Sequence, residues 1–360
     1  MTYLLGIDTS CDETSGAIVQ DSTVISNVIS SQIALHQPYG GVFPTVAKLA
    51  HQEKIAPVVT ATLKRAQLTP AQLDGVAVTV GPGLAPALEV GLKFAKDFAL
   101  QNHLPLLAVN HLEGHLLSPF LQPCPRSSAH SHRSPPASHF PSLGLVVSGG
   151  HTQFVKINDF GSYQLLGETL DDAAGECLDK IGRLLNLGYP AAPVIEQLAK
   201  TGDPTVYRFP LPLTTHHDYN LSFSGLKTYA RNLITKLETD SPLTPVTISN
   251  LACATQEGVF RHLVYKLDKL LRYYQNSPEQ TPFIQILVGG GVAQNARFRT
   301  LVRKVAANYH LPIFFPYHQK ICGDNAAMIA FAALSHFRQK DFATTPTAIN
   351  AIERQPNLSI

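Results

Sequence analysis

The sequence predicts an α/β protein whose two halves repeat the same order of elements. The first observation is that residues 3–21 and 143–159 each contain an apolar strand, a polar turn and a second strand. The second is that each half continues with a buried strand, a glycine-containing turn and a helix, in residues 75–100 and 284–309. The order of elements is repeated although the residues themselves are not.

Each strand–turn–helix segment has the features of a layered α/β sheet. The strands are short apolar runs, "GVAVTV" and "IQILV", and helical periodicity follows the glycines. Strands of this composition are usually covered by helices on both faces. A short apolar strand follows each helix, "LPLLAV" at 104–109 and "LPIFF" at 311–315.

Four polar or glycine-containing turns, two in each half, lie where these strands end. They are "DTSCDETS" (8–15), "VGPG" (80–83), "VSGGHT" (147–152) and "VGGGVAQN" (288–295). Backbone N–H groups at such turns can face phosphate oxygens. The arrangement resembles the superfold of actin, hexokinase and other sugar kinases, and Hsp70 (ASKHA). In this actin-like ATPase fold, two duplicated α/β domains hold a nucleotide in the cleft between them.

These halves predict the domain boundaries. We expect a first actin-like subdomain in residues 1–120, with a C-terminal helix at 324–340 returning to it. A second actin-like subdomain is expected in residues 141–323, enlarged by a mainly helical insertion at 160–280.

Two segments break the symmetry of the halves. In the insertion, a helix is expected to begin at Thr169, because a threonine cap followed by acidic residues favours a helix start. Residues 121–140 are rich in Pro, Ser and His. Their three histidines could bind metal, but the composition favours a surface insert.

Composition limits the classes of function. The 360 residues carry a formal net charge of +2, so a nucleic acid would need a local patch or a partner. Five scattered cysteines form no C-x-x-C pair, which indicates a reducing compartment. The N-terminus does not read as a signal peptide, and no run approaches the ~20 apolar residues that span a bilayer. We expect a cytoplasmic protein without a membrane partner.

The stretch "VNHLEGHLLSP" (109–119) indicates a metal site. On a helix, His111 and His115 share one face while Glu113 points about 200° away, so Glu113 cannot act as the base of an H-E-x-x-H protease. The best third ligand is Asp324, which follows a glycine at an expected helix N-terminus. Two histidines and an aspartate suit Fe(II), Zn(II) or Mn(II). A bare H-x-x-x-H pair is also compatible with two ordinary polar residues.

Nine motifs occur in this order: "GIDTSCDETS", "GGVFP", "VGPGLAPALEVGL", "NHLEGH", "LVVSGGHTQ", "LGETLDDAAGECLDKIGRLL", "SFSGLKT", "GGGVAQN" and "CGDNAAMIA". Their order resembles that of the tRNA N6-adenosine threonylcarbamoyltransferases, which include bacterial TsaD and were formerly labelled O-sialoglycoprotein endopeptidases. The resemblance covers residues 3–335 apart from the 121–140 insert.

The resemblance implies a transferase that installs t6A. It would move the threonylcarbamoyl group from threonylcarbamoyl-AMP to N6 of adenosine 37 in tRNAs that read codons beginning with A. A separate synthase would make the adenylate from threonine, bicarbonate and ATP. Bacterial members need helper subunits, a degenerate TsaB-type paralogue and a small TsaE-type P-loop ATPase. One divalent metal per subunit is implied, usually iron, Fe(2+).

The resemblance also implies roles for individual residues. His111, His115 and Asp324 would hold the metal. The first phosphate loop beside it would contain Asp8, Ser10, Asp12 and Glu13. Threonylcarbamoyl-AMP, or ATP, would contact Val147, Ser148, Gly149, Gly150, His151, Asp179, Ala192, Glu196 and Asn295.

The implied chemistry needs no protein nucleophile. A carbamoyl-adenylate is already activated, so the enzyme must place the N6 amine near the carbamoyl carbon and stabilise the developing oxyanion. A carboxylate near the first loop could take the proton of N6. Asp12 and Glu13 are the candidates for this catalytic role.

The chain departs from the family pattern at two places. Where the family usually has Tyr-Pro-Gly-Gly-Pro, Ala191 and Ala192 add two methyl groups that could tighten the adenosine pocket. Thr45 and Lys48 stand where Glu and Arg are common, and Lys lacks the bidentate geometry of Arg. Two other functions remain open at this point, a metalloprotease and a regulatory actin-like ATPase.

Overall fold

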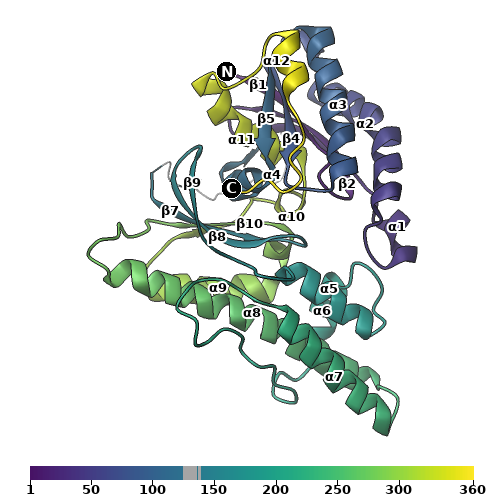
Figure 1. Ribbon diagram of the computed structural model, residues 1–360, viewed down its shortest axis with the longest axis vertical. Coiled ribbons are helices and arrows are strands. Elements are labelled where there is room, and N and C mark those ends of the chain that lie inside the picture. Colours follow the sequence, from purple (N-terminus) through teal and green to yellow (C-terminus); the bar gives the residue numbers. More distant parts are fainter. Residues whose placement is uncertain (125–135, 137–138) are drawn as a thin grey trace. The chain divides into compact units, whose positions relative to one another are not determined.

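The computed structural model describes residues 1–124, 136 and 139–360, so the insert predicted at 121–140 lies largely outside the described residues. The chain forms two compact units. Unit 1 contains residues 1–138, 160–162 and 314–360, and unit 2 contains residues 139–159 and 163–313. Figure 1 shows the elements of each unit along the chain, and each unit is described by itself.

The sheet of unit 1 has six strands in the order β5-β4-β1-β2-β3-β6. These strands are β1 (Tyr3–Asp8), β2 (Glu13–Gln20), β3 (Thr23–Ser31), β4 (Gly75–Gly81), β5 (Leu106–Asn110) and β6 (Gln122–Pro123). β1 is antiparallel to β2 and parallel to β4, and β5 runs parallel to β4. The strand–turn–strand prediction for residues 3–21 is therefore confirmed.

Helices cover both faces of this sheet. They are α1 (Ile33–His36), α2 (Pro44–Ala66), α3 (Ala85–Asn102), α4 (His111–Leu117), α10 (Gln319–Cys322), α11 (Ala326–Gln339) and α12 (Pro346–Ala351). Gly6 of β1 packs against α11, whereas Gly16 of β2 packs against α2. Gly16 lies opposite Ile7, which points away from Gly6 because side chains alternate along a strand. Hence α11 and α2 lie on opposite faces.

The sheet of unit 2 repeats the order of the first. Its strands are β7 (Ser142–Val147), β8 (Thr152–Asp159), β9 (Ser162–Glu168), β10 (Ile286–Gly289) and β11 (Ile313–Phe314), arranged β11-β10-β7-β8-β9. This order matches β5-β4-β1-β2-β3 position by position. β7 is antiparallel to β8 and parallel to β10, as β1 is to β2 and β4. The predicted repeat of elements is confirmed.

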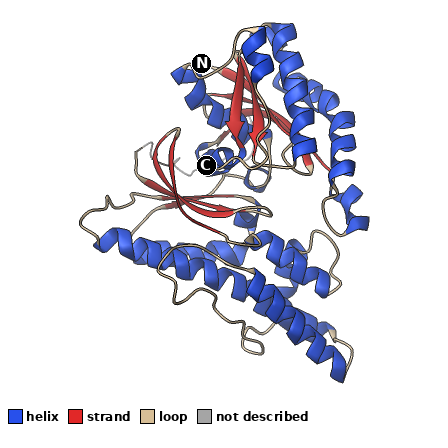
Figure 2. Ribbon diagram, in the orientation of Figure 1, coloured by secondary structure: helices blue, strands red, loops and turns tan. Residues whose placement is uncertain are grey.

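Five α-helices lie in the described residues of unit 2, and Figure 2 draws helices in blue. They are α5 (Ala174–Leu184), α6 (Ala192–Ala199), α7 (Ser224–Asp240), α8 (Pro245–Asn276) and α9 (Ala296–Asn308). α8 carries a long stripe of buried side chains that includes Phe260, Leu263 and Leu267, which is the core stripe expected from its spacing. It packs against α5, α6, α7 and α9.

Residues 160–280 also contain one strand, and one local prediction for them is wrong. Residues 162–168 form strand β9, because Gly161 with φ +78° allows a tight turn after β8. The next helix starts at Ala174 and not at Thr169. The Thr169 hydroxyl donates to the carbonyl of Asp172, so it closes a turn before the helix.

Among the described residues, we find no helix that combines the length and the apolar character needed to cross a membrane.

Candidate metal centre and nucleotide-binding loops

The two histidines of the motif lie on the short helix α4. The helix begins at His111, and the side chain of Asn110 caps it by accepting from the Leu112 amide at 2.8 Å. Every residue of α4 is buried. The ring centroids of His111 and His115 are 4.7 Å apart and nearly perpendicular. The predicted helix with both imidazoles on one side is therefore confirmed.

Asp324 completes a compact group with these imidazoles. One ligand atom each from His111, His115 and Asp324 lies within 4.8 Å of the others. The Oδ1 atom of Asp324 is 3.1 Å from Nε2 of His115 and 3.5 Å from Nε2 of His111. Asp324 directly precedes Asn325, which caps the N-terminus of α11. A buried helix end thus fixes the carboxylate near the α4 histidines.

Asp8 places a second carboxylate beside the group. Its Oδ1 atom lies 3.7 Å from Nδ1 of His111, and its side chain is fully buried. Burial lowers the pKa of His111, but the charges of Asp324 and Asp8 outweigh burial and raise it to about 10. Burial raises the pKa of Asp324, but His111 and hydrogen bonds from both imidazoles hold it well below its ordinary value.

The residues present fit a divalent metal. The Nδ1 atoms of His111 and His115 are buried and have no hydrogen-bond partner among the described residues. For His115, burial and the neighbouring His111 charge lower the pKa, which favours the neutral imidazole that ligates metals. Two imidazoles and a carboxylate form a donor set common to iron, zinc and manganese sites.

Glu113, the residue between the two histidines, points elsewhere. Its Oε2 atom accepts from Nε2 of His336 at 3.0 Å, and the other ring nitrogen of His336 bonds Asp341. The hydrogen bond that His336 donates to Glu113 raises the pKa of His336 to about 9 despite its burial. Glu113 therefore forms an ion pair with α11 and is not part of the metal group.

The first loop, between β1 and β2, lies in the same unit as the metal group. Asp8 accepts from the amide and the hydroxyl of Ser10 at 3.2 and 3.3 Å. The pKa of Glu13 is raised well above its ordinary value by burial and then by the neighbouring Asp12 and Asp324. The loop is also held by His51, which bonds the Cys11 carbonyl at 3.0 Å. His51 was not singled out from the sequence, because α2 brings it there from 40 residues away.

The second turn of unit 1, "VGPG", is paired within the protein. The Gly83 amide donates to the carbonyl of Pro356, and the Leu84 amide donates to the carbonyl of Ser10. These amides are therefore hydrogen-bonded to the C-terminal segment and to the first loop. In this structure they do not point at an open phosphate site.

In unit 2, the turn after β7 leaves two glycines open. The Ser148 hydroxyl accepts from the His151 amide at 3.0 Å, which closes the turn. Gly149 and Gly150 are exposed, and apart from their chain neighbours no residue has an atom within 4 Å of the position that a Cβ would take on either. Val147 is buried at the end of β7. Such an open pair of peptide groups can approach an anion closely.

Three more of the implied residues stabilise helix ends in unit 2. Asp179 accepts from the amides of Ala191 and Ala192 at 2.8 and 2.7 Å. Glu196 accepts from the Ala296 amide at 2.8 Å, and Asn295 caps α9 through the Phe298 amide at 3.0 Å. These side chains therefore fix the loops that surround them.

Ala191, which stands where the family usually has glycine, packs against Gly182. Ala191 is buried, and its methyl group faces Gly182 of α5, where a Cβ would collide with it. This methyl group therefore packs between α5 and α6. Thr45 and Lys48 are exposed on the first turns of α2.

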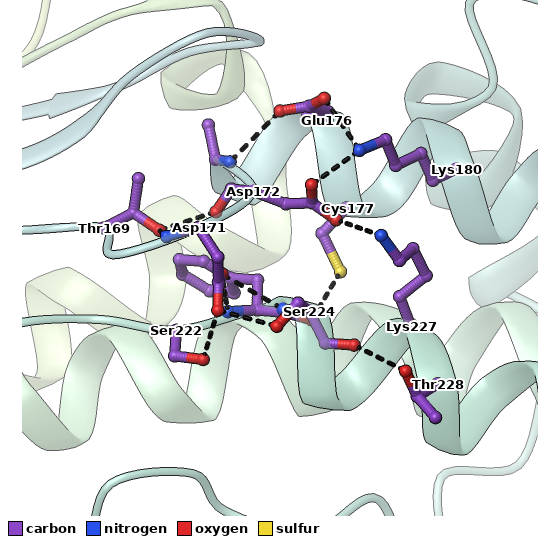
Figure 3. Close-up of polar contacts among 12 residues, drawn as sticks. Thr169, Asp171, Asp172, Glu176, Cys177, Lys180, Ser222, Ser224, Lys227 and Thr228 are labelled. Carbon is purple, nitrogen blue, oxygen red and sulfur yellow. Dashed lines mark hydrogen bonds and ion pairs between the residues drawn. The ribbon is translucent and has the colours of Figure 1, made fainter.

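A network of charged groups anchors the N-terminus of α5, as Figure 3 shows. Asp171 accepts from the Ser222 and Ser224 hydroxyls at 2.6 and 2.7 Å and from the amides of Phe223 and Ser224. Asp172 pairs with Lys180 at 2.5 Å and with Lys227 at 2.8 Å. These contacts tie the start of α5 to the start of α7.

The anchored helix supports the open glycine turn. The Gly175 amide donates to the carbonyl of Ser148 at 3.1 Å, and a Cβ on Gly175 would lie 2.6 Å from that oxygen. The Ala174 amide donates to the hydroxyl of Thr152 at 2.9 Å. The sequence did not indicate that Asp171 and Ser222 hold this helix, because the two residues are about fifty positions apart in the chain.

The predicted site residues thus fall into two sets. His111, His115 and Asp324 come together in unit 1 with Asp8, Ser10, Asp12 and Glu13 in the adjoining loop. Residues 147–151, Asp179, Ala192, Glu196 and Asn295 belong to unit 2.

Solved structures of other proteins show the same fold. HypF of T. kodakarensis is 14% identical and matches 97% of this chain and 49% of its own, with a TM-score of 0.57. Component A of the (R)-2-hydroxyglutaryl-CoA dehydratase of Acidaminococcus fermentans is 13% identical, with a TM-score of 0.50 over 92% of this chain and 97% of its own. At these identities the likeness concerns the fold alone, which is the actin-like ATPase fold.

Curated relatives are much more similar in sequence. A protein of Gloeothece citriformis named tRNA N6-adenosine threonylcarbamoyltransferase is 42% identical over 99% of this chain and 97% of its own. A protein of the same name from Carboxydothermus hydrogenoformans is 42% identical over 97% and 96%. The family model for TsaD, tRNA N6-adenosine threonylcarbamoyltransferase, matches residues 23–331. The chain therefore belongs to the tRNA N6-adenosine threonylcarbamoyltransferase family.

Proposed function

We propose that this protein transfers the threonylcarbamoyl group of threonylcarbamoyl-AMP to N6 of adenosine 37 in tRNAs that read codons beginning with A. The observation that carries the proposal is the group formed by the buried His111 and His115 with the partly exposed Asp324, in a chain of this family. Such a group suits a reaction at phosphate and carbonyl oxygens.

We propose that His111, His115 and Asp324 hold one divalent metal, Fe(2+), with Zn(2+) and Mn(2+) as the alternatives. Their donor set supports this assignment, as does the buried Nδ1 atom of His115, which has no hydrogen-bond partner among the described residues. When bound, the metal would supply positive charge to the oxygens of the adenylate. Asp8, buried 3.7 Å from His111, would orient that imidazole through its second nitrogen.

The remaining chemistry is assigned to the chain's own groups. The open amides at Gly149 and Gly150 would bind the adenylate, together with Val147, Ser148 and His151 of the same turn. In the transfer, the N6 nitrogen forms a bond to the carbamoyl carbon while the bond from that carbon to the AMP phosphate oxygen breaks. Asp12 or Glu13 would take the proton that N6 loses. AMP leaves with the electron pair of the broken bond.

Helices are fixed around the proposed adenylate contacts. Asp179, Glu196 and Asn295 hold the loops at Ala192 and at the start of α9, so we assign them to placing these loops against the adenosine. The partners we propose are tRNA, a TsaB-type paralogue, a TsaE-type P-loop ATPase and a separate synthase that delivers the adenylate.

The test is mass analysis of nucleosides from tRNA incubated with this protein, the proposed partners, threonine, bicarbonate and ATP. We expect t6A to form with the wild-type chain. His115→Ala should lower its yield by at least the roughly 10- to 100-fold that is typical when only a residue supporting a metal ligand is lost, since here a ligand itself is removed. His310→Ala is the matched control, because His310 is exposed on the surface of unit 2.

Absence of t6A with the wild-type chain, under conditions where a relative's protein forms it, would overturn the proposal. Single-turnover transfer from preformed adenylate then separates binding from proton transfer. A double substitution of Asp12 and Glu13 by Ala that left this rate unchanged would exclude them as proton acceptors.

A further inference from the structure

A pocket in unit 2 lies apart from all the residues assigned above. It has a volume of about 580 Å³ and is lined by Arg208, Phe209, Pro210, Leu211, Tyr229 and Arg261. The first four belong to the loop between α6 and α7, Tyr229 to α7 and Arg261 to α8. Helices α7 and α8 are labelled in Figure 1.

The pocket is built by specific contacts. Phe209 is buried against Gly258 of α8, where a Cβ would lie 2.8 Å from the Cβ of Phe209. The ring of Tyr229 meets that of Phe209 edge-on at 5.0 Å, and its hydroxyl donates to the Arg208 carbonyl. A guanidinium N–H of Arg261 donates to the Phe209 carbonyl at 3.1 Å. The loop backbone is thus held in place and the aromatic rings form part of the wall.

The charge of the pocket is positive. Its six lining residues include two arginines and no carboxylate. Arg208 is exposed, and within the described residues its side chain has no hydrogen bond or ion pair. Glu257, one turn before Arg261 on α8, is already paired with Arg297 through two hydrogen bonds. The guanidinium of Arg208 therefore remains available for an anionic ligand, together with the N–H groups of Arg261 that do not bond Phe209.

The loop that carries Arg208 is fixed along α8. The Tyr265 hydroxyl donates to the carbonyl of Thr214, Lys266 donates to the carbonyl of Asp218, and Lys269 donates to that of His216. Residues 204–217 contain no acidic side chain but include one arginine and two histidines. These three contacts fix the loop beside the pocket, and Lys266 itself is buried and paired with Asp218, so Arg208 and Arg261 carry the positive charge of the pocket.

We propose that this pocket binds a phosphate of the tRNA backbone, with Arg208 and Arg261 contacting its oxygens and the ring of Tyr229 stacking on an adjacent base. This inference rests on the proposed function, which makes tRNA a substrate. Guanidinium groups match phosphate geometry, and aromatic rings stack on unpaired bases. With a net charge of +2 over the whole chain, RNA binding needs a local cationic patch of this kind.

The pocket also has a suitable position within its unit. Glu257 and Arg261 share one face of α8, because they are four residues apart. Glu257 holds Arg297, and Gln256 holds Asn295 at 2.9 Å, so consecutive turns of α8 support the pocket and the proposed adenosine loop. A long polyanion can reach both places, whereas a small nucleotide at the loop would not need the pocket.

The test compares Arg208→Ala and Arg208→Glu with Arg231→Ala, another exposed arginine, on α7 two residues beyond Tyr229. Arg208 has no structural bond to lose, so both variants should fold as the wild type does. Binding of fluorescent tRNA is measured over a series of salt concentrations, and KM and kcat are measured for t6A formation. Arg208→Ala should weaken tRNA binding roughly three- to tenfold and reduce the salt slope by about 1.

The outcomes separate this inference from the proposed function. If wild-type protein forms t6A and Arg208→Ala matches Arg231→Ala in tRNA affinity, the pocket proposal is overturned while the function stands. If tRNA binding weakens at Arg208 but no t6A forms with wild type, the RNA site stands and the function fails. If Arg208→Glu impairs assembly with a helper subunit while tRNA affinity is kept, the pocket belongs to a protein partner and the proposal is wrong.

Discussion

At the scale of single residues, the contacts of two acidic side chains distinguish the metal group from its surroundings. Asp324 faces two imidazoles, whereas Glu113, between the same two histidines in sequence, faces His336. The helix geometry expected from the sequence already separated Glu113 from the histidines. What it could not provide was the partner of Glu113, which lies 223 residues away.

The Glu113–His336 pair predicts a pH dependence of stability. The pKa of His336 is raised from 6.5 to about 9, so its stabilisation is fully present below pH 6.5 and is lost as the pH rises through 9. His336→Gln should therefore cost on the order of 2 kcal/mol of unfolding free energy near neutral pH and much less above pH 9. Urea denaturation across this range measures the difference.

A control for this prediction is His310→Gln at an exposed position. Its unfolding free energy should stay within about 0.5 kcal/mol of the wild-type value, as is usual for an exposed position. A difference for His336→Gln that did not change with pH would mean that the charge of His336 does not stabilise the fold.

At the scale of elements, glycine allows strand β1 and helix α11 to pack closely. A Cβ on Gly6 would collide with the carbonyl of Ala326 and lie 2.9 Å from the Ala330 amide nitrogen. Both are backbone atoms, so neither can turn away as a side chain could. α11 follows directly after Asp324 and Asn325. The packing of α11 against β1 therefore also determines where Asp324 lies.

Gly6→Ala should consequently destabilise unit 1 by about 1–3 kcal/mol, as overpacking of a close contact does. Thermal denaturation measures the loss. Gly225→Ala in the first turn of α7 is the matched control, since no atom lies within 4 Å of its Cβ position. That variant should be neutral or slightly more stable, because alanine favours a helix. Equal effects of the two substitutions would contradict the packing argument.

The helix ends show where local patterns were insufficient. The predicted helix start at Thr169 is wrong because Asp171 and Asp172, which follow it, bond residues about fifty positions further along the chain. Asp171 caps α7 and not α5, through the Ser222 and Ser224 region. Burial raises the pKa of Asp171, but hydrogen bonds from Ser222, Phe223 and Ser224 outweigh this and lower it. In the sequence, an aspartate that caps a distant helix looks the same as one that caps the helix next to it.

At the scale of the whole molecule, the group of His111, His115 and Asp324 joins segments that are far apart in the chain. A metal held there links α4 to the start of α11, and it binds the folded chain rather than the unfolded one. Divalent metal should therefore increase the free energy of unfolding, by about 2.7 kcal/mol at a concentration 100 times its Kd. The Tm should rise accordingly. Asp324→Asn, which has nearly the same shape, should show little or no such rise.

Calorimetric scans with Fe(2+) under anaerobic conditions, with Zn(2+), with Mn(2+) and with a chelator provide the measurement. The size of the rise ranks the three metals. A rise as large in Asp324→Asn as in the wild type would place the metal elsewhere.

The sequence by itself determined the repeated strands and helices, the turns at their ends and the shared face of His111 and His115. These features follow from periodicities of two and 3.6 residues, which neighbours in sequence set. Only the tertiary structure decided that Asp324 meets His115 across 209 residues, that "VGPG" is paired internally, and that Asp171 caps a distant helix. The reason is physical: a carboxylate or an amide takes whichever partner the packed sheets and helices bring near it, and local spacing does not encode that partner.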